Sequence, residues 1–136
     1  MSGPISSDKE PKVIYADDCG NAPKKRVLRD FNIAFAKADM AFILDQVAEN
    51  IEWNIVGDRV IKGKTQFAEM LKKMKKDSVL EIHLNQIITH GNVASANGLL
   101  VFDNNRKIAF CDVYLFNNFS KHAKIKEITS YVIELT

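Results

Sequence analysis

The sequence predicts one α+β domain, in which three N-terminal helices pack on the concave face of a curved, mainly antiparallel sheet and form a cone. Three observations predict it. Amphipathic segments occupy residues 23–77, long runs rich in β-branched and aromatic residues follow Asp77, and short polar segments connect these runs. Connections this short favour antiparallel neighbours. The length of 136 residues is typical of one domain.

The helices are predicted from apolar spacing and from their first residues. Pro23 is typical of a first helical turn, and a helix follows whose apolar residues recur every three or four positions: Val27, Leu28, Phe31, Ala34, Phe35 and Ala38. Asp39 is expected to cap a second, shorter helix with Phe42, Ile43 and Val47. A third helix is expected to start at 63–65 and to carry Phe67, Met70, Leu71 and Met74 on one face.

The strands are predicted from alternation and from turn residues. Residues 50–56 alternate with a period of two and end at Gly57. Four longer strands are expected at residues 79–89, 93–102, 108–116 and 125–135.

Composition argues against several classes of partner. With 19 basic and 17 acidic residues, the net charge of +2 does not indicate nucleic acid or a membrane as a partner. The lysines at 72–76 alternate with apolar residues, as on the solvated face of a helix. No histidine pair has metal-ligand spacing, so neither a metal nor another cofactor is expected.

The first twelve residues are polar and contain two prolines, so residues 1–12 are expected to be a mobile tail before a domain at 13–136. The two cysteines form no spacing motif, and no signal peptide or long apolar run is present. These features predict a cytoplasmic location.

Asp112 is the candidate catalytic residue. It is the only charged residue in the apolar run 108–116, where an ionised carboxylate is costly to bury unless something pairs with it. Such groups occur mostly in structural networks or in pockets where chemistry takes place. We expect Asp112 to point into a ligand cavity, the alternative being a structural acid held by the backbone.

Alternation along the strands predicts which residues surround Asp112. Phe110 and Tyr114 share its face, Ala96 and Gly98 on the neighbouring strand would leave room for a cavity, and Ser130 on the last strand could donate a hydrogen bond to it. Phe31 and Phe35 would reach the cavity from the first helix. Outward residues of the last two strands are also apolar, which predicts a homodimer through the outer sheet face: Cys111, Val113, Leu115, Tyr131 and Ile133.

The element order, the segments 49–53 and 61–64, and the closing stretches 111–116 and 125–134 resemble the nuclear transport factor 2-like superfamily, and within it the bacterial SnoaL-like branch. The resemblance covers about residues 23–135 and implies one such domain at 13–136. It specifies the fold more than the activity, since this fold hosts isomerases, epoxide hydrolases, dehydratases, cyclases and binding domains. The resemblance also favours Trp53 as a wall of the cavity.

Two enzyme templates from this superfamily fit only in part. Against ketosteroid isomerases, the late-strand acid falls on Asp112, but the base falls on Asn54 and the helix tyrosine on Phe31, neither of which can do that chemistry. Trp53 and Asn54 cannot both face the cavity, so the register of their strand stays open. Against limonene-epoxide hydrolases, the last-strand aspartate falls on Ser130, and the strand at 93–102 contains no Arg-x-Asp.

The sequence therefore leaves three functions open. The first is a lyase, isomerase or cyclase that acts on a small apolar molecule with Asp112 as general acid or base. The second is a ligand-binding or sensing domain without catalysis, and the third is a dimeric scaffold subunit. The acidic segment 17–21 before the first helix is a candidate lid over the cavity mouth.

Overall fold

The computed structural model describes residues 10–135. Its elements are, in chain order, β1 (Lys12–Tyr15), the 3-10 helix η2 (Asp17–Gly20), α1 (Pro23–Lys37), α2 (Met40–Gln46), β2 (Val47–Ile55), β3 (Arg59–Lys62), α3 (Lys64–Met74), β4 (Val79–His90), β5 (Val93–Phe102), β6 (Lys107–Phe116) and β7 (Ile125–Leu135). The predicted α+β class is confirmed.

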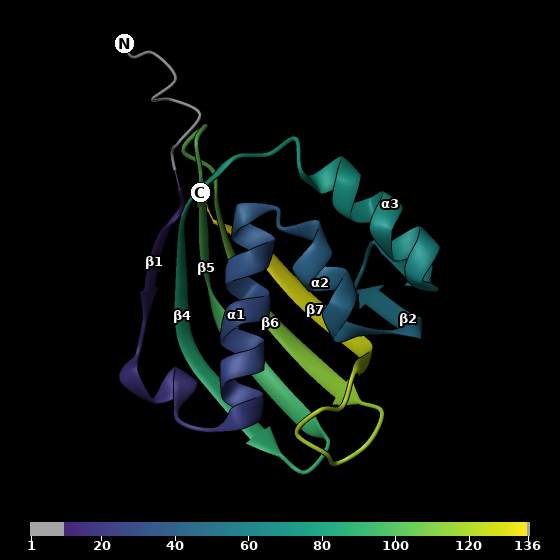
Figure 1. Cartoon of the computed structure of the whole chain (residues 1–136). Helices are drawn as coiled ribbons and strands as arrows, with labels where there is room; N and C mark the ends of the chain where they lie inside the picture. The colour runs from purple at the N-terminus through teal and green to yellow at the C-terminus, as the bar shows by residue number, and fades with distance from the viewer. Residues whose placement is uncertain (1–9, 136) are drawn as a thin grey trace.

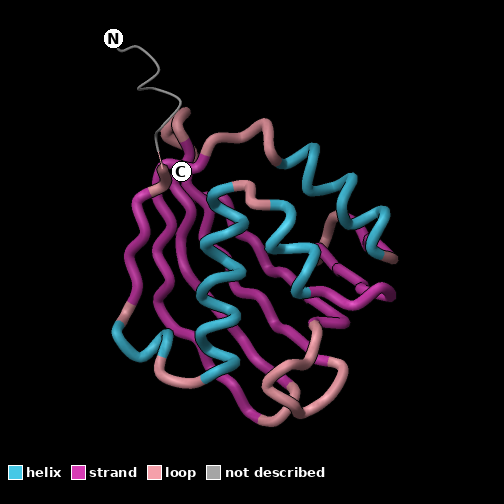
Figure 2. Tube along the Cα trace, viewed as in Figure 1, coloured by secondary structure: helices cyan, strands magenta, loops and turns pink. Residues whose placement is uncertain are grey.

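The strands form one seven-stranded sheet in the order β1-β4-β5-β6-β7-β2-β3. The β1–β4 and β2–β7 pairs are parallel and the other pairs are antiparallel, so the sheet is mainly antiparallel as predicted. The long strands β4 to β7 curve, and α1 and α2 lie in front of one face of the sheet (Figure 1). Figure 2 shows the same face from the same side, with the helical segments crossing the strands.

Local sequence explains where the helices begin. Pro23 is the first residue of α1, where its missing N–H leaves no donor unpaired. The Asp39 carboxylate accepts a hydrogen bond from the Phe42 N–H at 3.2 Å and caps α2 as predicted. Gly63, with a φ of 86°, precedes α3 in a conformation that favours glycine.

Two boundaries differ from prediction, and two short strands were not predicted. Val47, expected in the second helix, is the buried first residue of β2, where it pairs with Ile125. The strands β1 and β3 were not predicted, because runs of four residues are too short to show a periodicity. Lys12, expected in the mobile tail, is paired with Glu81 in β1, while residues 1–9 of that tail lie outside the described residues.

The core lies between the helices and the inner face of the sheet. Its largest fully buried side chains come from α1, α3, β6 and other elements of both layers and include Phe31, Phe67, Tyr114 and Phe116. Alternation along β6 is as predicted, since Phe110 and Tyr114 are buried while Val113 is exposed. Among the described residues, no helix is long and apolar enough to cross a membrane.

Candidate functional site

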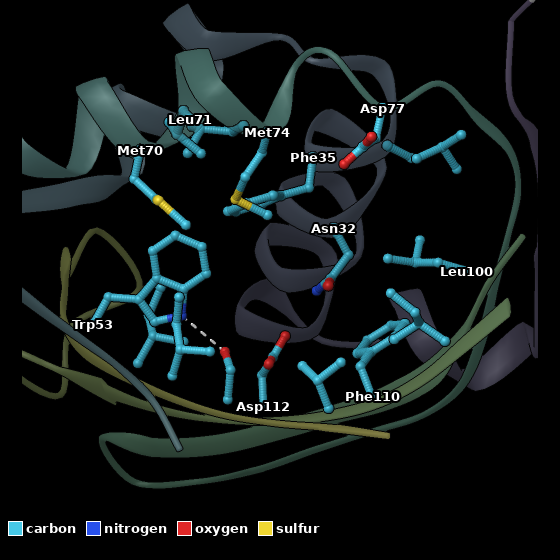
Figure 3. A pocket seen from close by; sticks show the side chains of 18 of the residues that line it. Asn32, Phe35, Trp53, Met70, Leu71, Met74, Asp77, Leu100, Phe110 and Asp112 are labelled. Carbon is cyan, nitrogen blue, oxygen red and sulfur yellow. Dashed lines mark hydrogen bonds between the residues drawn. The ribbon is translucent and has the colours of Figure 1, made fainter. Parts of the chain in front are cut away.

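A cavity of about 500 Å³ lies between the helices and the inner sheet face, within the range of small-molecule sites. Figure 3 shows it from close by, with Asp112 and Phe110 on the sheet side and Met70, Leu71 and Met74 on the opposite side. Most of the lining is apolar, and the aromatic part of the wall comes from Phe31, Phe35, Trp53, Phe102, Phe110 and Tyr114.

Aromatic contacts hold this wall together. The Phe35 ring packs edge-on against Phe31 and Trp53, with ring centroids 5.3 Å and 5.8 Å apart. Phe31 in turn packs edge-on against Tyr114 at 6.1 Å, and Trp53 lies 5.3 Å from Phe67. These contacts tie α1 and α3 to the sheet, so the walls are preorganised by the core.

Asp112 lines the sheet side of the cavity next to three buried residues, Asn32, Tyr114 and Ser130, and we call this part of the cavity its inner end. The Asp112 side chain is part-buried and borders the cavity. Burial raises the pKa of Asp112 to about 6, while hydrogen bonds from Ser130 and Tyr114 act in the opposite direction. The cavity thus contains a carboxyl that changes charge near neutral pH.

Two hydroxyl groups hold the Asp112 carboxylate from two strands. The Tyr114 hydroxyl donates to its Oδ2 at 3.2 Å, and Ser130, directly opposite Asp112 in the β6–β7 register, also hydrogen-bonds to the carboxylate. The Trp53 indole Nε1–H donates to Ser130 Oγ at 2.9 Å. Burial and the Asp112 charge raise the pKa of Tyr114 well above its usual value, so the phenol keeps its proton.

Asn32 completes this network from α1, and sequence reasoning did not identify it. Its side-chain Nδ2 donates to the Leu28 carbonyl at 2.8 Å and to the Tyr114 hydroxyl at 3.1 Å. Asn32 is 5% exposed and follows Leu28 by four residues, which places it on the buried face of the helix. A polar residue at a position of the helix that otherwise faces the core was the signal that could have revealed it.

The structure brings most of the predicted site residues together. Asp112, Trp53, Phe31, Phe35, Phe110, Tyr114 and Ser130 all line the cavity. Trp53 is buried and Asn54 is exposed, which settles the register of β2 in favour of Trp53. Phe31 is a wall of the cavity.

Ala96 and Gly98 are not among the described residues that line the cavity. Both are buried on the inner face of β5. A Cβ at Gly98 would overlap the His83 carbonyl and approach the Phe110 ring, so this glycine permits close packing and does not widen the hollow.

The acidic segment 17–21 is not a lid, since none of its residues lines the cavity. It forms η2, whose Cys19 is fully buried, and the Arg26 guanidinium donates to the Gly20 carbonyl at 3.3 Å. The exposed end of the cavity is formed by other residues that sequence reasoning did not assign: Val56, Asp58, Met74, Lys75, Asp77, Arg106 and Val132. We call this set the mouth.

No cluster of three or more His, Cys, Asp or Glu side chains that could hold a metal ion occurs among the described residues. The two cysteines, Cys19 and Cys111, are free. Asp112 and its hydrogen-bond partners are the polar groups at the inner end of the cavity.

Comparison with solved structures shows the fold. An NTF2-like protein of unknown function from Cytophaga hutchinsonii is 28% identical, with 79% of this chain and 97% of that chain covered and a TM-score of 0.57. The epoxide hydrolase/cyclase-like enzyme SalBIII, described in pyran ring formation in the polyether salinomycin, is 17% identical over 81% of this chain and 90% of that chain, with a TM-score of 0.69.

A putative SnoaL-like polyketide cyclase from Shewanella denitrificans is 12% identical over 81% of this chain and 90% of that chain, with a TM-score of 0.66. No protein-family model matches the sequence, and no curated protein matches it. The similarities to solved structures confirm the fold that the sequence resemblance predicted.

Proposed function

We propose that this chain, which has the nuclear transport factor 2-like fold, binds a small apolar molecule and acts on it as a lyase, isomerase or cyclase, with Asp112 as general acid or base. One observation supports this most. A single carboxyl with a pKa of about 6 lies at the inner end of an apolar cavity of about 500 Å³.

The position of Asp112 suits proton transfer. With a pKa of about 6 the group is mostly ionised at pH 7, with roughly one molecule in ten protonated, so both base and acid forms are available. The hydroxyls of Tyr114 and Ser130 fix the carboxylate in one orientation. An apolar ligand that displaces water from the cavity would favour the protonated form further.

The shape of the site supports a ligand of this class. We infer that the helices and the curved sheet form a cone with its open end at the mouth and Asp112 near its inner end. Similar structures include a cyclase-like enzyme and a putative polyketide cyclase, which favours an apolar, ring-forming substrate.

The experiment compares the protein with its Asp112→Asn variant on apolar hydroxyketones and hydroxy-epoxides in deuterated buffer. NMR follows deuterium exchange beside the carbonyl and epoxide opening. We expect the wild type to act on at least one compound and Asp112→Asn to be about 100-fold slower or worse. Asp45→Asn, an exposed acid away from the cavity, is the matched control. Equal rates for wild type and Asp112→Asn would disprove the catalytic role.

A binding domain without catalysis is the second candidate. Among the described residues, the inner end of the cavity contains no second acid or base besides Asp112 and the protonated Tyr114. Native mass spectrometry of the purified protein would favour this candidate if it finds an apolar ligand that is released chemically unchanged after incubation.

A further inference from the structure

The hydrogen atoms of the polar groups at the inner end of the cavity are all used within the protein. Trp53 Nε1–H donates to Ser130, and both Ser130 and Tyr114 donate to Asp112. The two Nδ2 hydrogens of Asn32 go to the Leu28 carbonyl and the Tyr114 hydroxyl. When Asp112 is ionised, as it is at pH 8, no polar hydrogen at this end is left for a ligand among the described residues.

The orientation of the Asn32 amide is fixed by its partner. A flipped amide would place Oδ1 against the Leu28 carbonyl, and two acceptors do not bond, so Nδ2 must lie where it does. This leaves Asn32 Oδ1, in a side chain only 5% exposed, without a donor among the described residues. Asn32 lines the cavity, and its side chain points toward Asp112 (Figure 3).

The free groups at this end are therefore acceptors: Asn32 Oδ1 and the lone pairs of Asp112 that Tyr114 and Ser130 do not occupy. A buried acceptor without a partner is costly, so a ligand that supplies a donor gains affinity there, and one that offers only an acceptor does not. Donors at the mouth, on Lys75 and Arg106, are exposed or partly exposed and belong to the opposite end of the cavity.

We propose that the ligand of this cavity is an apolar molecule with a hydrogen-bond donor, a hydroxyl or an ammonium group, which binds between Asn32 Oδ1 and the Asp112 carboxylate. This rests on the proposed function and defines its substrate class. It excludes, as the inner polar group, a carboxylate or a carbonyl that has no hydrogen to donate.

The test uses four probes with one apolar cage: 1-adamantanol, 1-adamantylammonium, 2-adamantanone and adamantane-1-carboxylate. Trp53 is the only tryptophan of the chain and lines the cavity, so its fluorescence reports binding directly. At pH 8 we expect the alcohol and the ammonium to bind about tenfold or more tightly than the ketone and the carboxylate.

A variant then reverses the preference. Asp112→Asn keeps the size of the side chain, and its Oδ1 can accept from Tyr114 and Ser130 while its Nδ2 presents new donors to the cavity. We expect this variant to bind the ketone at least as tightly as the alcohol and to lose its affinity for the ammonium. The control, Asp45→Asn, keeps the wild-type order.

The outcomes separate this inference from the proposed function. If the wild-type protein binds the ketone as tightly as the alcohol, the donor requirement is wrong and the binding site stands. If none of the four probes changes Trp53 emission, the cavity is not a site for small apolar molecules and the proposed function fails as well.

Discussion

Asp112 connects the stability of the protein to its chemistry. Its pKa in the folded protein, about 6, lies above the ordinary value of 3.8 because burial disfavours the charged form. Folding therefore favours the protonated acid, and the stability it contributes is complete below pH 4 and is lost as pH rises through 6. The shift corresponds to a cost of about 3 kcal/mol above that range.

This cost makes Asp112→Asn a stabilising substitution. At pH 8 we expect the free energy of unfolding to rise by about 1–3 kcal/mol, because the variant has no buried charge. At pH 4, where Asp112 is protonated, we expect little difference. Urea unfolding at both pH values measures this, and Asp45→Asn is the control. A variant that is less stable than wild type at pH 8 would show that Asp112 is a structural acid.

The Tyr114 hydroxyl tunes this carboxyl. It donates to Asp112 at 3.2 Å and favours the ionised form, so Tyr114→Phe should raise the pKa of Asp112 above 6. NMR titration of the Asp112 carboxyl carbon measures the shift. Tyr131→Phe removes an exposed hydroxyl on the outer face and should leave the pKa unchanged. A fall in the Asp112 pKa in Tyr114→Phe would contradict the hydrogen bond described here.

At the scale of elements, Gly98 allows β4 and β5 to pack closely. The β4–β5 register shifts between Leu84 and Gln86, next to the Leu84–Gly98 pair, and this irregularity brings the His83 carbonyl against Gly98. The chain thus needs a residue without a Cβ here, which the sequence shows only as a glycine inside a strand pattern.

We expect Gly98→Ala to destabilise the protein by about 2 kcal/mol or more, since its methyl group would meet backbone that cannot rotate away. Gly57→Ala is the matched control. It has open space but a φ of 83°, so only the strain of that conformation, about 1 kcal/mol, is expected. Thermal unfolding compares the two. If adding Phe110→Leu restores Gly98→Ala to wild-type stability, the Phe110 ring and not the His83 carbonyl is the obstacle.

Long elements were predictable because their periodicity repeats. Phe31 and Phe35 recur at helical spacing, and Phe110, Asp112 and Tyr114 alternate over a strand long enough to fix its inner face. Short strands were not predictable, because their own residues show no repeat. β1 pairs with β4, which is remote in sequence, and β3 pairs with β2 across a turn. Val47 was assigned to a helix because its spacing fits both periods.

At the scale of the whole molecule, the site could be predicted only in part. Alternation on single strands identified Asp112, Tyr114 and Ser130, but the orientation of the Asn32 amide depends on contacts between α1 and β6. The prediction that Ala96 and Gly98 line the cavity was wrong. A small residue leaves room for a cavity only if no neighbour fills the space, and at Gly98 the His83 carbonyl and the Phe110 ring fill it. The mouth joins residues from distant segments, including Asp77 and Arg106, which no local pattern connects.

The two faces of the sheet have different roles in the whole molecule. The inner face forms the core and the cavity, whereas the outer face carries exposed apolar side chains on adjacent strands. Among these, Val113 is 37%, Tyr131 50% and Ile133 65% exposed. Apolar side chains clustered on one face favour association. We propose that two copies of the chain pair through this outer face.

A homodimer of this kind predicts a specific loss on substitution. The wild type should sediment at twice the mass of the 15.3 kDa chain at micromolar concentration, and Val113→Glu/Ile133→Glu should sediment as a monomer, because four charges would be buried in the symmetric interface. Phe119→Glu, at an exposed apolar site in the loop between β6 and β7, should remain a dimer. Circular dichroism checks that all variants are folded. A monomeric wild type would show that the chain does not form this dimer. A double variant that remains a dimer would show that the interface lies elsewhere.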